Sequence, residues 1–154
     1  LLDQLSKWLV TVYLAPWTSV PVLGDFFKLT HIHNPGAVFG IRFGGVWVHL
    51  LFSGVAMAAV SRMLWKTSVD DRAGSIGLAL VLGGAAGNLL DRLEWILNTG
   101  GAVIDFLDFG IGSFRWYIFN VADACVTTGV GLLLLSYGTS RSEPTVDDGG
   151  AESV

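Results

Sequence analysis

The sequence predicts an all-α integral membrane protein with four transmembrane helices, and three observations support this prediction. Of the 154 residues, 52% are hydrophobic and only 14% are charged, whereas a soluble domain usually carries about 25% charged residues. The mean hydropathy is +0.59. The apolar residues gather in runs of helical period, some with the roughly 20 residues that a helix needs to cross a bilayer. Because lipid admits only helices and closed barrels, we expect helices.

The four apolar segments differ in length. Segment 1–14 is too short to span a bilayer and begins with Leu rather than Met, so we expect a first spanning helix that is truncated at its N-terminus. A short helix at the membrane interface is the alternative. Segments 46–64 and 118–137 reach spanning length, and 75–97 nearly does, with polar residues gathered at its end.

Residues 1–138 are expected to form one membrane domain, followed by a disordered acidic tail, 139–154. The tail has four acidic residues and one basic residue and is rich in Gly, so it accounts for most of the net charge of −4. Nothing in the remaining charge pattern suggests nucleic-acid binding. The single cysteine, Cys125, excludes an internal disulfide and a cysteine-based metal site.

Polar residues gather at one face of the predicted bundle. Alternating topology places the loops 15–45 and 98–117 on the same side of the membrane, beside the end of the third segment and the start of the fourth. The polar residues at this side include Asn88, Asp91, Asp105, Asn120 and Asp123. We expect Asp123 to lie about five residues into its helix, roughly 7 Å deep.

Spacing within the helices agrees with a shared polar site. Gly84, Asn88 and Asp91 lie on one helical face, and so do Asn120 and Asp123. The run GGAAG that includes Gly84 removes side-chain bulk, so that another backbone can approach closely. The two polar faces can therefore meet inside the bundle.

Two aspartates at this face suggest a catalytic pair. An ionisable residue within a membrane segment costs roughly 2.5–3.5 kcal/mol at the helix centre, so it usually faces an internal or water-filled site. Neighbouring carboxylates repel, so a purely structural network would avoid pairing Asp105 with Asp123, whereas Asn88 and Asn120 are equally compatible with a structural role. Two aspartates can share one proton, so that one activates water and the other polarises a carbonyl, without a cofactor.

Other catalytic arrangements fit the sequence poorly. No Ser-His-Asp set stands out among the few histidines. His31 and His33 could bind a metal from one strand, but no third ligand follows at a matching position, so we predict no metal. Cys125 lies on a different helical face from Asp123, which favours a core position over a nucleophile.

Five short motifs occur in order along the chain: DQLSK at 3–7, NPGAVFG at 34–40, GGAAGNLLDR at 83–92, VIDF at 103–106 and FNVAD at 119–123. Together they resemble the lipoprotein signal peptidase family, also called signal peptidase II. The resemblance implies an aspartyl endopeptidase of the bacterial inner membrane, with its active site facing the outer side. Such an enzyme removes the signal peptide of a prolipoprotein just before its diacylglyceryl-modified cysteine. We expect it to contact membrane lipid, to act as a monomer and to bind no nucleic acid.

The resemblance also implies roles for single residues. It assigns catalysis to Asp105 and Asp123. It assigns substrate binding or support of the pair to Asn34, Gly36, Asn88, Arg92, Asn120 and Ala122, and a structural polar role to Asp3, Lys7 and Asp91. Pro35 and Val38 stand where the family usually has Thr and Ala. Pro35 removes one backbone donor, which affects a main-chain hydrogen bond rather than the chemistry.

A small extramembrane sheet is expected over the outer face of the helices. Residues 27–30 alternate apolar and polar side chains, which suggests a short strand. The segment 103–109 can pair with it, and the resemblance supports this interpretation over an ordinary loop.

Two alternatives remain open from the residues alone. The chain could be a small non-enzymatic membrane protein, such as a proton-coupled transporter or an assembly factor, in which the acids relay protons. A relay would distribute carboxylates through the depth of the membrane, whereas here they gather at one end. Asp91 could also replace Asp105 in the pair with Asp123, and Asp108 is a further near neighbour of Asp105.

Overall fold

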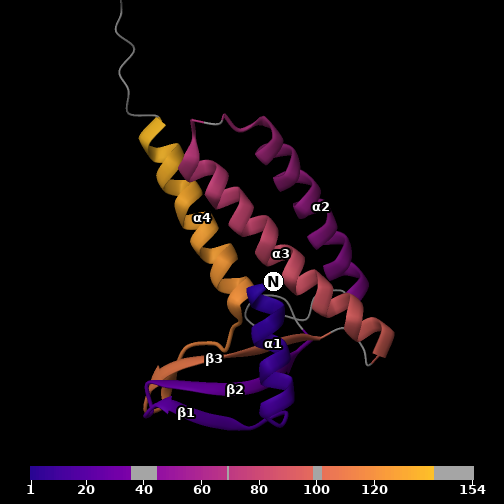
Figure 1. Ribbon diagram of the computed structural model, residues 1–154, viewed down its shortest axis with the longest axis vertical. Coiled ribbons are helices and arrows are strands. Elements are labelled where there is room, and N and C mark those ends of the chain that lie inside the picture. Colours follow the sequence, from indigo (N-terminus) through magenta and orange to yellow (C-terminus); the bar gives the residue numbers. More distant parts are fainter. Residues whose placement is uncertain (36–44, 69, 99–101, 141–154) are drawn as a thin grey trace, which may run out of the picture.

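A computed structural model of the chain describes residues 1–35, 45–68, 70–98 and 102–140. Three long helices run side by side, and a β-sheet lies across one end of them together with a short helix (Figure 1). The helices are α1 (Leu2–Tyr13), α2 (Gly45–Lys66), α3 (Arg72–Asn98) and α4 (Val121–Ser140). Four helices therefore follow the four predicted apolar segments.

Two of these helices, as far as the structure describes the chain, are long and apolar enough to cross a membrane: Gly45–Lys66 and Arg72–Glu94, with 22 and 23 residues. The apolar part of α4, Val121–Tyr137, is shorter, and α1 has 12 residues. The predicted number of four spanning helices is therefore supported for two of them by length and composition.

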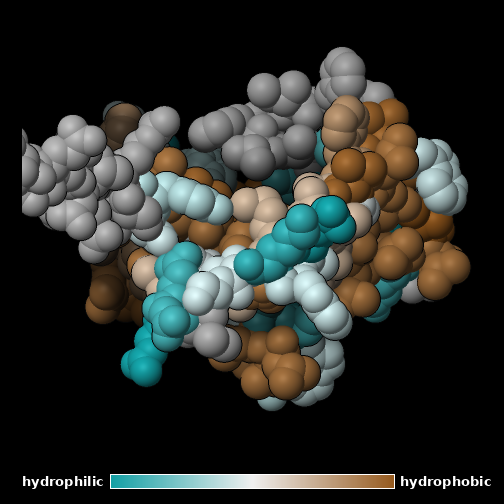
Figure 2. All heavy atoms as spheres, turned by 90° about the horizontal axis from the view of Figure 1, so that it is seen from above, coloured by the Kyte–Doolittle hydropathy of each residue, from teal (hydrophilic) through white to brown (hydrophobic). Residues whose placement is uncertain are grey.

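The outer surface of the bundle suits a lipid environment. None of the described residues of α2 is buried, and large apolar side chains such as Trp47, Leu51 and Val55 are exposed. Figure 2 shows hydrophobic side chains over the flanks of the bundle and hydrophilic ones at the end that faces the viewer. Large exposed apolar patches are uncommon on soluble proteins, and these flanks agree with the membrane protein that the sequence predicts.

Close approach of two backbones holds α3 against α4. A Cβ atom at Gly77 would lie 2.9 Å from the carbonyl oxygen of Gly129, and a Cβ atom at Gly129 would lie 2.6 Å from that of Gly77. At Gly84, a Cβ atom would collide with the carbonyl oxygen of Ala122. The prediction that the small-residue run admits another backbone is confirmed.

The sheet has four antiparallel strands in the order β1-β2-β3-β4. They are β1 (Ser19–Leu23), β2 (Phe27–Asn34), β3 (Val103–Ile111) and β4 (Phe114–Arg115). The predicted pairing of 27–30 with 103–109 is confirmed, and both strands are longer than expected. The predicted class all-α is therefore too narrow, because a four-stranded sheet accompanies the four helices.

Strands β1 and β4 were not predicted from the sequence, for two different reasons. Strand β1 contains Pro21, which argues against a central strand but is tolerated at the edge of a sheet, where β1 lies. Strand β4 has two residues, too few to show an alternating pattern.

Strand β2 carries an irregularity opposite β3. Leu29 lies opposite Leu107, but Ile32 lies opposite Asp105. Two residues of β2, Thr30 and His31, therefore face a single residue of β3. This is the arrangement of a β-bulge, which changes the side chains that one strand presents to the other.

Candidate active site

Helix α4 begins with a reciprocal pair of hydrogen bonds. The side-chain oxygen of Asn120 accepts a hydrogen bond from the main-chain N–H of Asp123 at 2.9 Å, and the carboxylate of Asp123 accepts one from the main-chain N–H of Asn120 at 3.3 Å. This is a capping box, in which Asn120 is the N-cap residue. Asp123 thus lies in the first helical turn, where the helix dipole favours a negative charge.

The predicted position of Asp123, about five residues into its helix, was therefore wrong. The prediction assumed a helix from residue 118, whereas α4 starts at Val121. Phe119 still belongs to extended backbone, because its main chain exchanges hydrogen bonds with Leu107 of β3. Asn120 is the first residue free to cap a helix.

Asp105 lies on β3 with 1% of its surface exposed. Its two carboxylate oxygens accept hydrogen bonds from the side-chain amides of Asn120, at 2.6 Å, and Asn34, at 2.8 Å. Burial raises the pKa of Asp105 from 3.8 to about 7, and the nearby charge of Asp123 adds to this increase. The two amide hydrogen bonds and the charge of Lys7 oppose it.

Asn88 of α3 connects Asp123 with Asn120 and Lys7. Its amide donates to the carboxylate of Asp123 at 2.8 Å. Its carbonyl oxygen accepts hydrogen bonds from Lys7 at 3.0 Å and from Asn120 at 3.1 Å. The position of Asp123 is thus set by its own helix cap and by α3.

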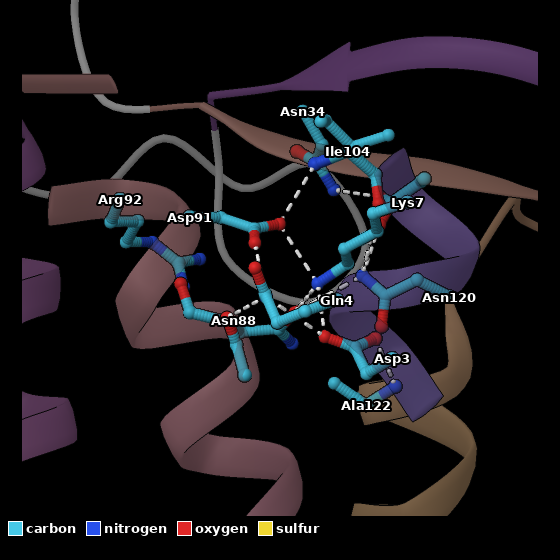
Figure 3. A network of polar contacts seen from close by, with 12 residues as sticks. Asp3, Gln4, Lys7, Asn34, Asn88, Asp91, Arg92, Ile104, Asn120 and Ala122 are labelled. Atoms are coloured by element: carbon cyan, nitrogen blue, oxygen red, sulfur yellow. Dashed lines mark hydrogen bonds and ion pairs between the residues drawn. The ribbon is translucent and has the colours of Figure 1, made fainter. Parts of the chain in front are cut away.

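A buried ion-pair network adjoins Asn88 through its hydrogen bond with Lys7 (Figure 3). The Nζ atom of Lys7 lies 2.8 Å from carboxylate oxygens of both Asp3 and Asp91, and only 2% of its side chain is exposed. The other oxygen of Asp3 accepts a hydrogen bond from the main-chain N–H of Ala122 at 2.8 Å. Helix α1 therefore supplies an acceptor for an N–H group that the first turn of α4 cannot satisfy itself.

The network also reaches β3 and α3. Asp91 accepts a hydrogen bond from the main-chain N–H of Ile104 at 3.2 Å and one from the side chain of Gln4 at 2.8 Å. A Cβ atom at Gly87 would lie 2.6 Å from an oxygen of Asp3, so only glycine leaves room for this carboxylate. Four elements of the fold, α1, α3, α4 and β3, are joined here.

A cavity of about 870 Å³ opens next to Asp123. Its polar lining includes Asn34, Asn88 and Arg92, and α2 contributes apolar residues such as Phe52. Asp123 lines the cavity, whereas Asp105 is enclosed beside it by the side chains that bind it. The site thus combines an apolar cleft with a pair of linked carboxyl groups.

A family model described as "Signal peptidase (SPase) II" matches residues 1–138 of the chain. The chain belongs to the signal peptidase II family. Curated relatives agree: the lipoprotein signal peptidase of Symbiobacterium thermophilum is 38% identical over 133 residues, which is 86% of this chain and 84% of the relative. That of Syntrophus aciditrophicus is 41% identical over 148 residues, or 93% of this chain and 89% of the relative.

Solved structures show the same fold. A bacterial membrane enzyme determined by the in meso method at 2.3 Å superposes with a TM-score of 0.81 and 26% identity, covering 99% of this chain and 87% of that one. A second, at 1.9 Å, has a TM-score of 0.76 and 28% identity and covers 88% and 84% of the two chains. The family resemblance inferred from the five motifs is confirmed. This signal peptidase II family member is a peptidase, and its neighbours and apolar helices indicate a membrane protein.

The structure brings most of the predicted site residues of this signal peptidase II chain together. Asn34, Asn88 and Asn120 contact the two aspartates, and Arg92 lines the cavity beside them. Ala122 takes part through its main-chain N–H. Gly36 lies outside the described residues.

Two other acids are engaged elsewhere. Asp91, the alternative partner for Asp123, is paired with Lys7. Asp108, predicted to be a near neighbour of Asp105, accepts hydrogen bonds from Arg115 and Thr30, each at 2.7 Å. Being three residues from Asp105, Asp108 points to the opposite face of β3.

Sequence reasoning missed two residues of the site. Gln4 holds Asp91 and also donates to the carbonyl of Gly87 at 3.0 Å. Its spacing of three residues from Lys7 places both on one face of α1 and could have identified it. Tyr117 lines the cavity near Asp123, and no pattern in the sequence indicated this.

The remaining candidate groups have simple surroundings. Cys125 is a free thiol of intermediate exposure. His31 and His33 contact each other through their Nε2 atoms at 3.1 Å. Across the four described ranges, no three His, Cys, Asp or Glu side chains are grouped so that they could hold a metal ion.

Proposed function

We propose that this peptidase removes the signal peptide from prolipoproteins by an aspartic mechanism, with Asp105 and Asp123 as the catalytic pair. The observation that carries the proposal is the position of Asn120, whose side chain binds Asp105 at 2.6 Å while its main chain and side chain cap the helix at Asp123. One residue thus joins the two carboxyl groups. Cleavage of a diacylglyceryl-modified prolipoprotein by the purified protein in detergent tests it.

The surroundings of the two acids suit them to different roles. The raised pKa of Asp105, about 7, allows it to hold a proton near neutrality, whereas Asp123 lies in the first turn of α4. Asp123 also lines the cavity, where water and substrate can enter. In the proposed reaction, Asp123 removes a proton from water, the water oxygen attacks the peptide carbonyl, and Asp105 donates a hydrogen bond to the carbonyl oxygen. Asp123 then returns the proton to the nitrogen that leaves.

Activity is expected to fall as the pH rises through about 7, the pKa of Asp105. The pair needs one proton, and above this pH it becomes doubly ionised, although the observed limb belongs to the coupled pair rather than to one residue. Stability changes in the same direction: the folded pKa lies above the ordinary value of 3.8, so the contribution of Asp105 is full below pH 3.8 and is lost as the pH rises to about 7. A pH profile of kcat measures the expected fall in activity. A rate that still increases between pH 7 and 9 would contradict the assignment of the proton.

Lipid modification of the substrate is expected to matter strongly. The cavity volume of about 870 Å³ is at the large end for ligand pockets, and its apolar wall on α2 adjoins the exposed apolar surface of the bundle. A lipid chain can therefore enter from the membrane while the peptide bond reaches Asp123. We expect kcat/KM for the unlipidated precursor to be lower by on the order of tenfold or more, since one fully buried apolar side chain already contributes about 1.5–3 kcal/mol. Equal cleavage of both precursors would refute this part of the proposal.

We also propose that the protein is a monomeric, multi-pass protein of the bacterial inner membrane, with residues 1–138 as its single domain and the sheet on the outer side. The last turn of α2 and the first turn of α3 lie at the end of the bundle opposite the sheet (Figure 1). Residues 141–154 of the predicted tail lie outside the described residues.

Thiol labelling can test this orientation. In a Cys125→Ala background, Ser113→Cys, in the exposed turn between β3 and β4, should react with a membrane-impermeant reagent in intact spheroplasts. Ser68→Cys, exposed after the end of α2, should react only after the membrane is permeabilised. The opposite pattern would invert the proposed topology.

A further inference from the structure

The β-bulge in β2 decides which side chain reaches Asp105. In the register of Leu29 and Leu107, the residue opposite Asp105 would be His31, and Asn34 would point to the other face of the sheet. The bulge shifts the pairing by one residue, so that Ile32 lies opposite Asp105 and Asn34 opposite Val103. Because a shift of one residue exchanges the two faces of a strand, the bulge places the Asn34 amide 2.8 Å from the Asp105 carboxylate.

His31, one of the two residues of the bulge, is anchored on several sides. Its ring is 1% exposed, and its Nδ1 atom lies 2.7 Å from the carbonyl oxygen of Leu14, at the end of α1. Its main-chain N–H donates to Thr18 at 3.0 Å, and its carbonyl accepts from Trp17 at 2.8 Å. The segment that joins α1 to β1 therefore binds both the main chain and the side chain of His31.

The hydrogen-bond partners of His31 also determine its tautomer. A carbonyl oxygen can only accept, so Nδ1 of His31 carries the hydrogen that binds Leu14. In the neutral ring, Nε2 of His31 is then the acceptor, and Nε2 of His33 donates to it across 3.1 Å. Thr30, the other residue of the bulge, is held as well, since its hydroxyl donates to Asp108 at 2.7 Å.

We infer that His31 is a positioning residue for the catalytic pair: it holds the bulge of β2 in the register that presents Asn34 to Asp105. The inference rests on the proposed function, because it takes Asp105 as catalytic. His31 does not contact the reacting groups, and its effect passes through the amide of Asn34.

His31→Phe removes both ring hydrogen bonds while filling the space. We expect kcat to fall by about 100-fold, the loss that a misplacement of roughly 1 Å can cause. The hydrogen bond from Asn34 lowers the pKa of Asp105. Without this bond the pKa should rise, so the alkaline limb of the pH profile should move to higher pH. Asp123, Lys7 and Arg92, which interact electrostatically with Asp105, are unchanged in this variant.

Asn34→Ala should reproduce both effects, and the double variant with His31→Phe should be no worse than Asn34→Ala alone, because the two residues act in series. His31→Asn places an amide N–H near the position of Nδ1 and should recover much of the activity through the Leu14 carbonyl. His31→Gln cannot make that contact and should not. If His31→Phe does not fold, His31→Gln takes its place in the test.

Phe27→Leu is the matched control. It weakens the stack of Phe27 on Phe109, whose ring centroids lie 4.6 Å apart in the same pair of strands, but it leaves the bulge intact. It should lower the unfolding temperature without moving the alkaline limb. A His31→Phe enzyme with an unshifted limb, or a double variant with a further additive loss, would reduce His31 to a structural role. Failure of the proposed function would appear separately, as an active Asp105→Asn enzyme.

Discussion

Replacing either Asp105 or Asp123 with Asn is expected to abolish prolipoprotein cleavage while the protein still folds and still binds the precursor. An Asn side chain keeps the size of the carboxyl group, and at position 105 the amide of Asn34 can turn over to complete the hydrogen bond now made at 2.8 Å. Neither amide can exchange the proton that the reaction needs. The loss in kcat should be on the order of 10⁴-fold, as for a single member of a catalytic unit.

The double variant provides a sharper test of the pair. Residues that act as one unit are not additive, so Asp105→Asn with Asp123→Asn should be no worse than either single variant. Measurement requires single-turnover cleavage of a lipidated precursor and, separately, precursor binding. A substantial further loss in the double variant would show that the two acids act independently.

Two neighbouring acids serve as controls. Asp108→Asn should remain active, because Asp108 lies on the opposite face of β3 and its carboxamide can still accept from Arg115. Asp91→Asn should fail mainly through stability or binding, since it weakens the pairing with Lys7. An active Asp105→Asn enzyme would exclude the proposed pair and redirect attention to Asp91.

Lys7→Met is expected to cause the largest loss of stability. The Nζ atom of Lys7 lies 2.8 Å from a carboxylate oxygen of Asp3 and 2.8 Å from one of Asp91, and only 2% of the Lys7 side chain is exposed. Removing one partner of a buried ion pair usually costs about 3–5 kcal/mol, because the remaining charge is left buried without compensation. The unfolding temperature in detergent should fall by roughly 10 °C or more.

Lys28→Met is the matched surface control. Lys28 forms an ion pair with Asp25 at 2.6 Å, but both side chains are accessible to solvent, and exposed pairs contribute little to stability. Its unfolding temperature should stay near that of the unmodified protein. Adding Asp91→Asn to Lys7→Met should recover part of the loss by removing one uncompensated charge. Equal destabilisation by Lys7→Met and Lys28→Met would show that burial of the network is not what makes it important.

Much of the helical part could be predicted from hydropathy. The predicted segments 46–64 and 75–97 correspond to α2 and to most of α3. A long apolar run in lipid must form its backbone hydrogen bonds within itself, and a helix does so. The spacing of Asn88 and Asp91 predicted a polar face on α3, and both residues do lie in the polar network. Asp105 was identified from its place in the loop that alternating topology puts beside the two polar helix faces, and the motif resemblance agreed with that choice.

Other features depend on segments that are distant in sequence. Periodicity states which residues share a face of one element, but it does not state the register of two strands or the start of a capped helix. The bulge in β2 brings Asn34 to Asp105 across 71 positions, and Lys7 meets Asp91 only because α1 packs against α3. The sequence by itself therefore determined the helices, the family and the candidate acids. Only the tertiary structure decided how those acids are held, because each hydrogen-bond partner is chosen by packing between elements rather than by the pattern within one.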